Sequence, residues 1–78
     1  MRAAMNTESL VKMANQIGDF FEAMPDRPEA LQGIAHHIRN FWEPRMRREL
    51  LAYLDQHGVS QLKPIVAQAL AAHRDTLG

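Results

Sequence analysis

Apolar residues recur at spacings of three and four along most of the chain, a period that is typical of amphipathic helices. In the first segment the expected apolar stripe consists of Leu10, Met13, Ile17, Phe20 and Met24. Asn6 or Thr7 is a suitable N-cap, and Glu8 carries the negative charge that the start of a helix favours. The pattern therefore predicts a first helix over about residues 8–23.

The segment Pro25-Asp26-Arg27-Pro28 interrupts this pattern and contains the start signals of a second helix. Asp26 is a favourable N-cap, and Glu29 stands three residues later, as in a capping box. The expected apolar stripe of this helix is Leu31, Ile34, Ile38 and Phe41. Because proline cannot continue a helix, we expect the second helix to end near Trp42 and a third to begin at Pro44.

The remaining chain predicts two more helices. The apolar face of the third is expected to hold Met46, Leu50, Tyr53 and Leu54. Gly58 is a good stop for it, because glycine adopts a left-handed conformation without steric cost. Ser60 is expected to cap the fourth helix, with Pro64 early in it. Its buried side is expected to consist of Leu62, Ile65, Val66, Ala69, Leu70 and Leu77.

These elements predict an all-α fold, a compact bundle of three or four short helices in which short connections make neighbours antiparallel. We expect residues 7–78 to form a single helical domain and residues 1–6 to form a flexible N-terminal tail. Gly18 has two open interpretations. It either lets another part of the chain approach closely, or it is a tolerated defect that costs about 1 kcal/mol relative to alanine.

Composition narrows the possible functions. The chain has 78 residues and no cysteine, so it can form no disulfide and can offer no thiolate to zinc or to an iron–sulfur cluster. Nine basic and nine acidic residues give a formal net charge of zero, which argues against a nucleic-acid protein and against a polybasic membrane anchor. Without a membrane-spanning apolar run or a secretory signal, a cytoplasmic location is expected.

No pattern of catalytic or metal-ligating residues stands out. His36 and His37 are adjacent, so on a helix they point about 100° apart and cannot hold one metal ion together. The chain has no nucleophile with a neighbouring base, no glycine-rich phosphate loop and no HExxH motif. We therefore expect no catalytic, cofactor-binding or metal-binding residue in this chain, and no enzymatic activity of its own.

The segment Phe41-Trp42-Glu43-Pro44-Arg45-Met46-Arg47-Arg48 is the strongest candidate for a binding surface. Trp, Arg and Met are enriched at protein interfaces, and Trp and Arg dominate binding hot spots. Two pairs of adjacent aromatic residues, Phe20-Phe21 and Phe41-Trp42, also indicate a binding surface. Successive helical side chains diverge by about 100°, so both members of a pair cannot centre one apolar stripe. The expected partner-binding residues are Phe21, Trp42, Arg45, Met46 and Arg48.

The alternative for this segment is a purely structural one. Arg45 has Glu49 four residues later, a spacing at which a solvated ion pair forms on a helix surface. A wide core face could also take in Phe21 and Trp42. Both alternatives stay open at the level of the sequence.

Two sequence blocks, Met-Ala-Asn-Gln-Ile-Gly at residues 13–18 and Phe-Trp-Glu-Pro-Arg-Met at residues 41–46, together with Ile-Ala-His-His-Ile at residues 34–38, carry a resemblance to a known family. Over about residues 7–70 the chain resembles the delta subunit of soluble, NAD-dependent, molybdenum-containing formate dehydrogenase. Neither of the two blocks contains recognised catalytic chemistry, so the resemblance points to a family and not to a site.

The resemblance implies a cytoplasmic complex. In that complex the large alpha subunit holds a molybdopterin guanine dinucleotide and oxidises formate, and iron–sulfur clusters pass electrons to an FMN subunit that reduces NAD. The delta subunit would hold none of these cofactors. It would bind the alpha subunit and support its assembly, stability or cofactor loading, either as a permanent subunit or as a chaperone that leaves.

Two other functions compete with this one. The chain could be a self-associating helical protein-binding module, and a homodimer of the isolated chain is compatible with either function. It could also bind nucleic acid through the cluster Arg45, Arg47 and Arg48, in which case binding would weaken steeply as the salt concentration rises.

Overall fold

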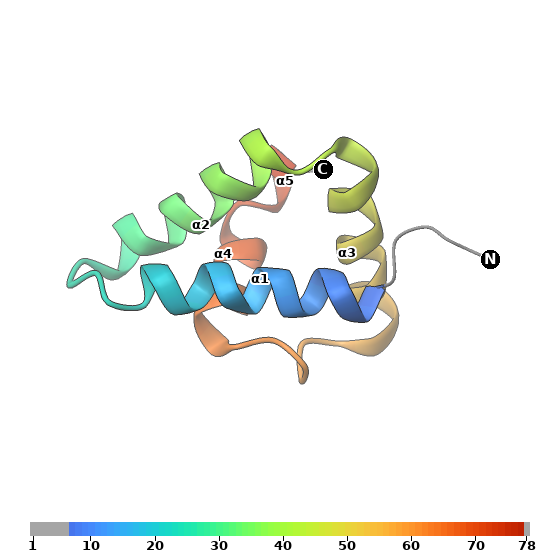
Figure 1. Ribbon diagram of the computed structural model, residues 1–78, viewed down its shortest axis with the longest axis horizontal. Helices are drawn as coiled ribbons and strands as arrows, with labels where there is room; N and C mark the ends of the chain where they lie inside the picture. Colours follow the sequence, from blue (N-terminus) through green and yellow to red (C-terminus); the bar gives the residue numbers. More distant parts are fainter. Residues whose placement is uncertain (1–6, 78) are drawn as a thin grey trace.

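A computed structural model describes residues 7–77 and shows five helices (Figure 1). They are α1 (Thr7–Phe21), α2 (Arg27–Phe41), α3 (Pro44–His57), α4 (Pro64–Ala72) and α5 (Arg74–Leu77). Within residues 7–77 there is no strand. The predicted all-α fold is therefore confirmed, with four helices where they were expected and one additional short turn of helix, α5.

The helices α1 and α2 form an antiparallel hairpin, and α3, α4 and α5 pack against it (Figure 1). α4 lies behind the hairpin and contacts both of its helices, while α3 crosses one end. α5 packs against α2 and α4. One face of the hairpin is thus turned away from α4.

The buried face of α1 differs from the predicted stripe. Its buried residues are Leu10, Val11, Ala14 and Gly18. Met13 is 39% exposed and Phe20 is 74% exposed, so their expected places in the core are wrong. The predicted stripe and the observed buried residues both have helical spacing. The helix turns the face with Ala14 and Gly18 inward, because these small residues let α4 come close.

Gly18 supplies the clearest example of this close approach. A Cβ atom added at Gly18 would lie 2.5 Å from Cγ2 of Val66 and 3.3 Å from Cγ2 of Ile65, both on α4. Of the two interpretations of this glycine, close packing is therefore the correct one.

The start of α2 follows the predicted capping pattern. The backbone N–H of Glu29 donates to Oδ1 of Asp26 at 3.1 Å, and Pro28 lies in the first turn. The core side of the helix consists of Ala30, Ile34, Ala35 and Ile38. The predicted core position of Phe41 is wrong, because this side chain is 74% exposed.

Later boundaries are partly as predicted. α3 begins at Pro44, and Gly58 ends it with φ 79° and ψ −166°, a conformation that is essentially restricted to glycine. The N-cap of α4 is Lys63, so the predicted cap at Ser60 is wrong. The residue before a proline is pushed out of the helical region, which delays the helix to Pro64. Asn15 on α1 holds this loop, since its Oδ1 accepts from the Lys63 N–H at 2.9 Å and its Nδ2 donates to the Gln61 carbonyl at 3.0 Å.

The residues predicted for the buried side of the fourth helix are buried, but Leu62 precedes α4 and Leu77 belongs to α5. Leu62, Ile65, Val66, Ala69, Leu70 and Leu77 are all buried. The tail expected at residues 1–6 lies outside the described residues. In the part of the chain that the structure describes, no helix is both long enough and apolar enough to span a bilayer.

Candidate functional site

Trp42, one of the predicted partner-binding residues, lies in the protein core. Its side chain is only 5% exposed and packs with the buried residues of α1, α2, α3 and α4. The expectation that Trp42 is left outside the core is therefore wrong. The 100° argument assumed a helix, but Trp42 is the C-cap of α2 with φ −95° and ψ 140°, and the extended chain leading to Pro44 turns the indole inward.

Arg47 is also buried, with 9% of its surface exposed. Within residues 7–77 its guanidinium contacts backbone carbonyls and no carboxylate. Nε donates to the Leu77 carbonyl at 3.1 Å, and Nη1 donates to the carbonyls of Arg39 at 3.0 Å and Trp42 at 3.1 Å. These carbonyls lie at the C-terminal ends of α2 and α5, where a positive charge is favourable. Arg47 therefore joins two helix ends, and the predicted cluster Arg45, Arg47 and Arg48 is not one exposed surface.

Arg45, Met46 and Arg48 have different surroundings from one another. Nε of Arg45 contacts Oε2 of Glu49 at 3.3 Å, and the Arg45 side chain is 73% exposed. Arg48 is exposed and has no ion pair within residues 7–77. Met46 is half-buried against the core. The exposed arginines can still contact a partner, but the local pair that the structural alternative proposed is present for Arg45.

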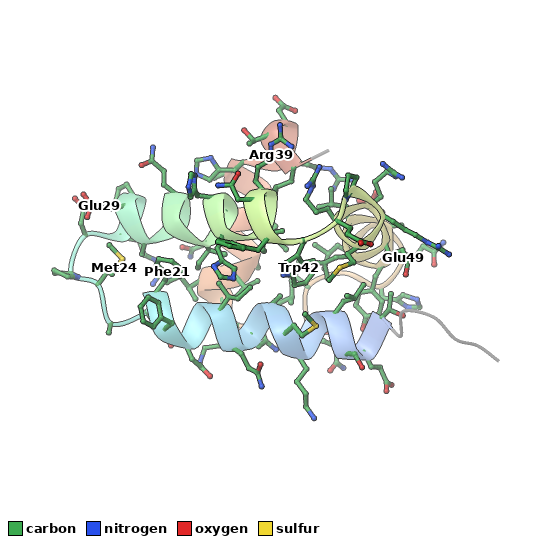
Figure 2. The ribbon with its side chains drawn as sticks, turned by 45° about the horizontal axis from the view of Figure 1, so that its top comes forward. Phe21, Met24, Glu29, Arg39, Trp42 and Glu49 are labelled. Atoms are coloured by element: carbon green, nitrogen blue, oxygen red, sulfur yellow. The ribbon has the colours of Figure 1, made fainter. Side chains whose placement is uncertain are left out.

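Phe21 is half-buried between the two helices of the hairpin. Its ring lies over the backbone of α2, where a Cβ atom added at Gly33 would collide with Cε1 of Phe21. Figure 2 shows Phe21 and Trp42 pointing into the space between α1 and α2. These two side chains belong to a single feature of the surface.

That feature is an open groove of about 430 Å³ on the hairpin face that is turned away from α4. We call it the hairpin groove. It is lined by Met13, Gln16, Ile17, Phe20, Phe21, His37 and Trp42. None of these side chains is an acid, a lysine or an arginine, and only Gln16 and His37 are polar.

Two exposed phenyl rings are each held by a neighbouring ring: Phe20 lines the hairpin groove, and Phe41 lies outside its lining but contacts the groove residue His37. Phe20 lies edge-on to Phe21 with ring centroids 5.1 Å apart and planes at 88°. Phe41 lies against His37 with centroids 4.8 Å apart and planes at 37°. Each phenylalanine is 74% exposed. The rings are therefore positioned by contacts within the chain while most of their surface faces water.

The ion pairs of the described residues lie away from the hairpin groove. Nζ of Lys63 contacts Oδ1 of Asp19 at 2.7 Å and Oε1 of Glu22 at 3.1 Å, and these two hydrogen bonds raise the pKa of Lys63. Arg74 donates to both carboxylate oxygens of Asp55, at 2.9 and 2.7 Å. The hydrogen bond from Arg74 lowers the pKa of Asp55 and raises the pKa of Arg74.

The described residues form no metal centre. Over residues 7–77, no group of three or more His, Cys, Asp or Glu side chains could hold a metal ion. His36 has a local partner, because its Nε2 lies 2.8 Å from Nδ2 of Asn40.

Comparison with known proteins places the chain in a family. The family model of the NADH-dependent formate dehydrogenase delta subunit, FdsD, matches residues 9–70. The chain belongs to this family. Every residue that lines the hairpin groove lies inside the matched range, so the groove is part of the delta-subunit domain. No curated protein and no solved structure matches the chain.

The sequence contained a signal for the missed residues Phe20 and Phe41. Ala14 and Gly18 lie four residues apart, so they share one face of α1, and a face of small residues is suited to close helix packing. Placing that face in the core puts Phe20 outside. For the second pair, Pro44 two residues after Trp42 signals that Trp42 leaves the helix, so helical spacing does not apply to it.

Proposed function

We propose that this delta subunit is a non-catalytic accessory subunit that binds the large alpha subunit of the formate dehydrogenase. We further propose that it supports the assembly, stability or cofactor loading of that subunit. The observation that carries the proposal is the hairpin groove, which has no charged side chain in its lining and contains the exposed Phe20, with the exposed Phe41 packed against the groove residue His37. The chain also belongs to a family of subunits.

The exposure of two phenylalanines is costly for a domain of this size. Burying a phenylalanine stabilises a protein by about 1.5–3 kcal/mol relative to leaving it in water. Phe20 and Phe41 each keep 74% of their surface exposed, although a folding chain of 78 residues has little apolar surface to spare. A partner that covers both rings would recover that free energy, which supports a protein-binding function.

The titratable groups support a non-catalytic function. Catalytic side chains commonly have shifted pKa values and lie in a cleft. In the described residues the shifted groups are Asp55, Lys63 and Arg74, and each takes part in an exposed ion pair away from the hairpin groove. The chain has no cysteine to ligate an iron–sulfur cluster. We propose that the other subunits hold the molybdopterin, iron–sulfur, FMN and NAD sites, as the resemblance to the family implies.

The nucleic-acid alternative has lost its main support. It required Arg45, Arg47 and Arg48 to act together, whereas Arg47 is buried and bound to backbone carbonyls.

We propose that the complex lies in the cytoplasm, as the resemblance to NAD-dependent formate dehydrogenases implies.

The proposal is tested by producing the formate dehydrogenase complex with and without this chain. Molybdenum content, subunit composition and formate-dependent NAD reduction are then measured on both preparations. We expect loss of the chain to lower the yield of active complex. Equal metal loading with lower thermal stability would indicate structural support, and poor metal loading would indicate a function in cofactor insertion. Unchanged yield, loading and stability would contradict the proposal.

A further inference from the structure

We propose that α5 is a conformational latch, an element that opens while α1 to α4 stay folded and whose opening loosens Trp42 through Arg47. The inference goes beyond the proposed function, because it concerns a motion within this chain and not a partner. It follows from the contacts that hold α5, from the groups that Arg47 joins and from the position of Trp42 in the hairpin groove.

α5 is held in place by contacts with other elements. A helix of four residues is not stable by itself, because the first turn of a helix is costly to form and few hydrogen bonds follow it. The side chain of Leu77 is buried in the core, and its backbone carbonyl accepts from Nε of Arg47. At the start of α5, Arg74 pairs with Asp55 on α3. Loss of these contacts would therefore unfold α5.

The release of α5 does not require another helix to move. α5 is the last of the described helices, and it packs on α2 and α4 from outside their contacts with α1. It also lies outside residues 9–70, the range that the family model matches, whereas Arg47 and Trp42 lie within that range. Short elements at a chain end that have few contacts open with a lower free energy than central helices. We therefore expect α5 to open without global unfolding.

Arg47 connects α5 to the end of α2. Its Nε donates to the Leu77 carbonyl, and its Nη1 donates to the carbonyls of Arg39 and Trp42. When α5 opens, Arg47 loses the Leu77 carbonyl and its buried guanidinium becomes accessible to water. Water then competes for the N–H groups of the guanidinium, so its hydrogen bonds to the two remaining carbonyls weaken. Opening of α5 therefore loosens the end of α2.

Trp42 is the residue at which this loosening reaches the hairpin groove. Its N–H donates to the Ile38 carbonyl at 3.0 Å, its carbonyl accepts from Arg47, and its side chain lines the groove. A weaker hold on the Trp42 carbonyl lets the last turn of α2 fray and lets the indole move. Because coupling between two sites is reciprocal, a state that orders Trp42 also favours the closed form of α5. The state of α5 and the shape of the groove are thus coupled.

The test is native-state hydrogen exchange of the full chain, measured residue by residue with NMR. The N–H of Leu77, which donates to the His73 carbonyl at 3.2 Å, reports on α5. The N–H of Trp42 reports on the end of α2, and the N–H of Ala14 in the middle of α1 reports on global unfolding. We expect Leu77 and Trp42 to exchange through one common opening, whose equilibrium constant is at least about tenfold larger than that of Ala14 and nearly independent of low urea concentrations.

A substitution in the core separates local opening from global unfolding. Val66 is a buried side chain of α4 that faces Gly18 of α1, at a distance from α5 along the helix. Val66→Ala should destabilise the whole fold and accelerate exchange at Ala14 about tenfold. Because the local opening leaves this contact intact, exchange at Leu77 and Trp42 should stay unchanged.

Two substitutions of exposed arginines test what holds the latch. Arg74→Gln removes the ion pair between α5 and α3, and Arg45→Gln removes an exposed ion pair within α3 as the matched control. We expect Arg74→Gln to accelerate exchange at Leu77 and Trp42 by the same factor, about two- to fivefold, and Arg45→Gln to leave both rates unchanged. Leu77→Ala removes the buried side chain of the latch and should accelerate both amides equally, by about tenfold or more.

Two results would overturn the inference. If Leu77 exchanges as slowly as Ala14 and is accelerated with it in Val66→Ala, α5 opens only when the whole chain unfolds, and there is no latch. If Arg74→Gln or Leu77→Ala accelerates exchange at Leu77 and leaves Trp42 unchanged, α5 opens without moving the end of α2, and the coupling through Arg47 is wrong. If Arg74→Gln changes neither rate, the comparison of the two amides in Leu77→Ala decides. Neither failure affects the proposed function, because no partner takes part in the experiment.

Discussion

Arg47 donates a hydrogen bond to the backbone carbonyl of Trp42 at 3.1 Å, and both residues are buried. The same guanidinium holds the carbonyls of Arg39 and Leu77, so one side chain on α3 satisfies backbone acceptors at the ends of α2 and α5. This contact fixes the extended segment between α2 and α3. It thereby keeps the indole of Trp42 between the helices, where it lines the hairpin groove.

Replacing Arg47 by methionine should destabilise the fold strongly. The change leaves three buried or partly buried carbonyls without a donor, and each unpaired buried polar group costs about 1–3 kcal/mol. We expect a loss of about 2–4 kcal/mol in the free energy of unfolding. Urea denaturation followed by circular dichroism measures it.

Arg47→Lys and Arg45→Ala serve as controls. Lysine keeps the charge but lacks the planar fork that reaches three carbonyls. The loss of unfolding free energy in Arg47→Lys should therefore lie between zero and that of Arg47→Met. Arg45→Ala removes an exposed ion pair and should change stability by less than about 1 kcal/mol. An Arg47→Met protein as stable as the parent would show that this side chain does not join the helices.

Gly18→Ala should destabilise the protein although alanine is the better helix former. The added methyl group would lie 2.5 Å from Cγ2 of Val66, a buried side chain on α4 that has little room to move. Overpacking of this kind costs about 1–3 kcal/mol, which exceeds the gain of about 1 kcal/mol in helix propensity.

A double-mutant cycle identifies the cause of this effect. In a Val66→Ala background the methyl group of Gly18→Ala has space, so we expect the second substitution to cost less there than in the parent. Thermal unfolding of the parent, the two single variants and the double variant gives the coupling free energy between the two substitutions. Additive effects would mean that Val66 is not what constrains residue 18.

The ion pair between Asp55 and Arg74 should give stability a dependence on acid pH. The hydrogen bond from Arg74 lowers the pKa of Asp55 in the folded state. The contribution to stability is therefore complete above about pH 4, the ordinary range of an aspartate, and is lost as the pH falls through the folded pKa. Because both groups are exposed, the effect should be small and should weaken as the salt concentration rises.

Asp55→Asn provides the comparison for this prediction. The difference in unfolding free energy between the parent and Asp55→Asn should be constant between pH 6 and pH 8 and should shrink below about pH 4. Urea denaturation at each pH measures the difference. A difference that grows on acidification would have the opposite sign and would contradict the assignment.

Much of this fold is predictable from local signals, because those signals act within a few residues. The cap at Asp26, the helix start at Pro44 and the stop at Gly58 depend on steric effects that hold in any protein. The faces of the helices are less predictable. In α1 two stripes have helical spacing, and the choice between them depends on how closely α4 can approach Gly18.

The predicted binding surface and the hairpin groove share only Phe21 and Trp42, because the groove lies between α1 and α2 and not along residues 41–48. The adjacent pairs Phe20-Phe21 and Phe41-Trp42 correctly indicated that aromatic surface would be left over. Which member of each pair is exposed depends on tertiary contacts, since Trp42 turns inward only after α2 has ended. The burial of Arg47 could not be read from spacing, because its three acceptors are backbone carbonyls that come together only in the folded chain.

The central claim is that Phe20 and Phe41 are exposed in order to bind the alpha subunit and not to stabilise the fold. The double variant Phe20→Ser/Phe41→Ser separates these two functions, because surface substitutions usually change stability by less than about 0.5 kcal/mol. The decisive measurement is the dissociation constant of the alpha subunit for this variant and for the parent, with unfolding free energies measured alongside. We predict binding at least tenfold weaker with stability nearly unchanged. Equal binding by a folded double variant would contradict the claim.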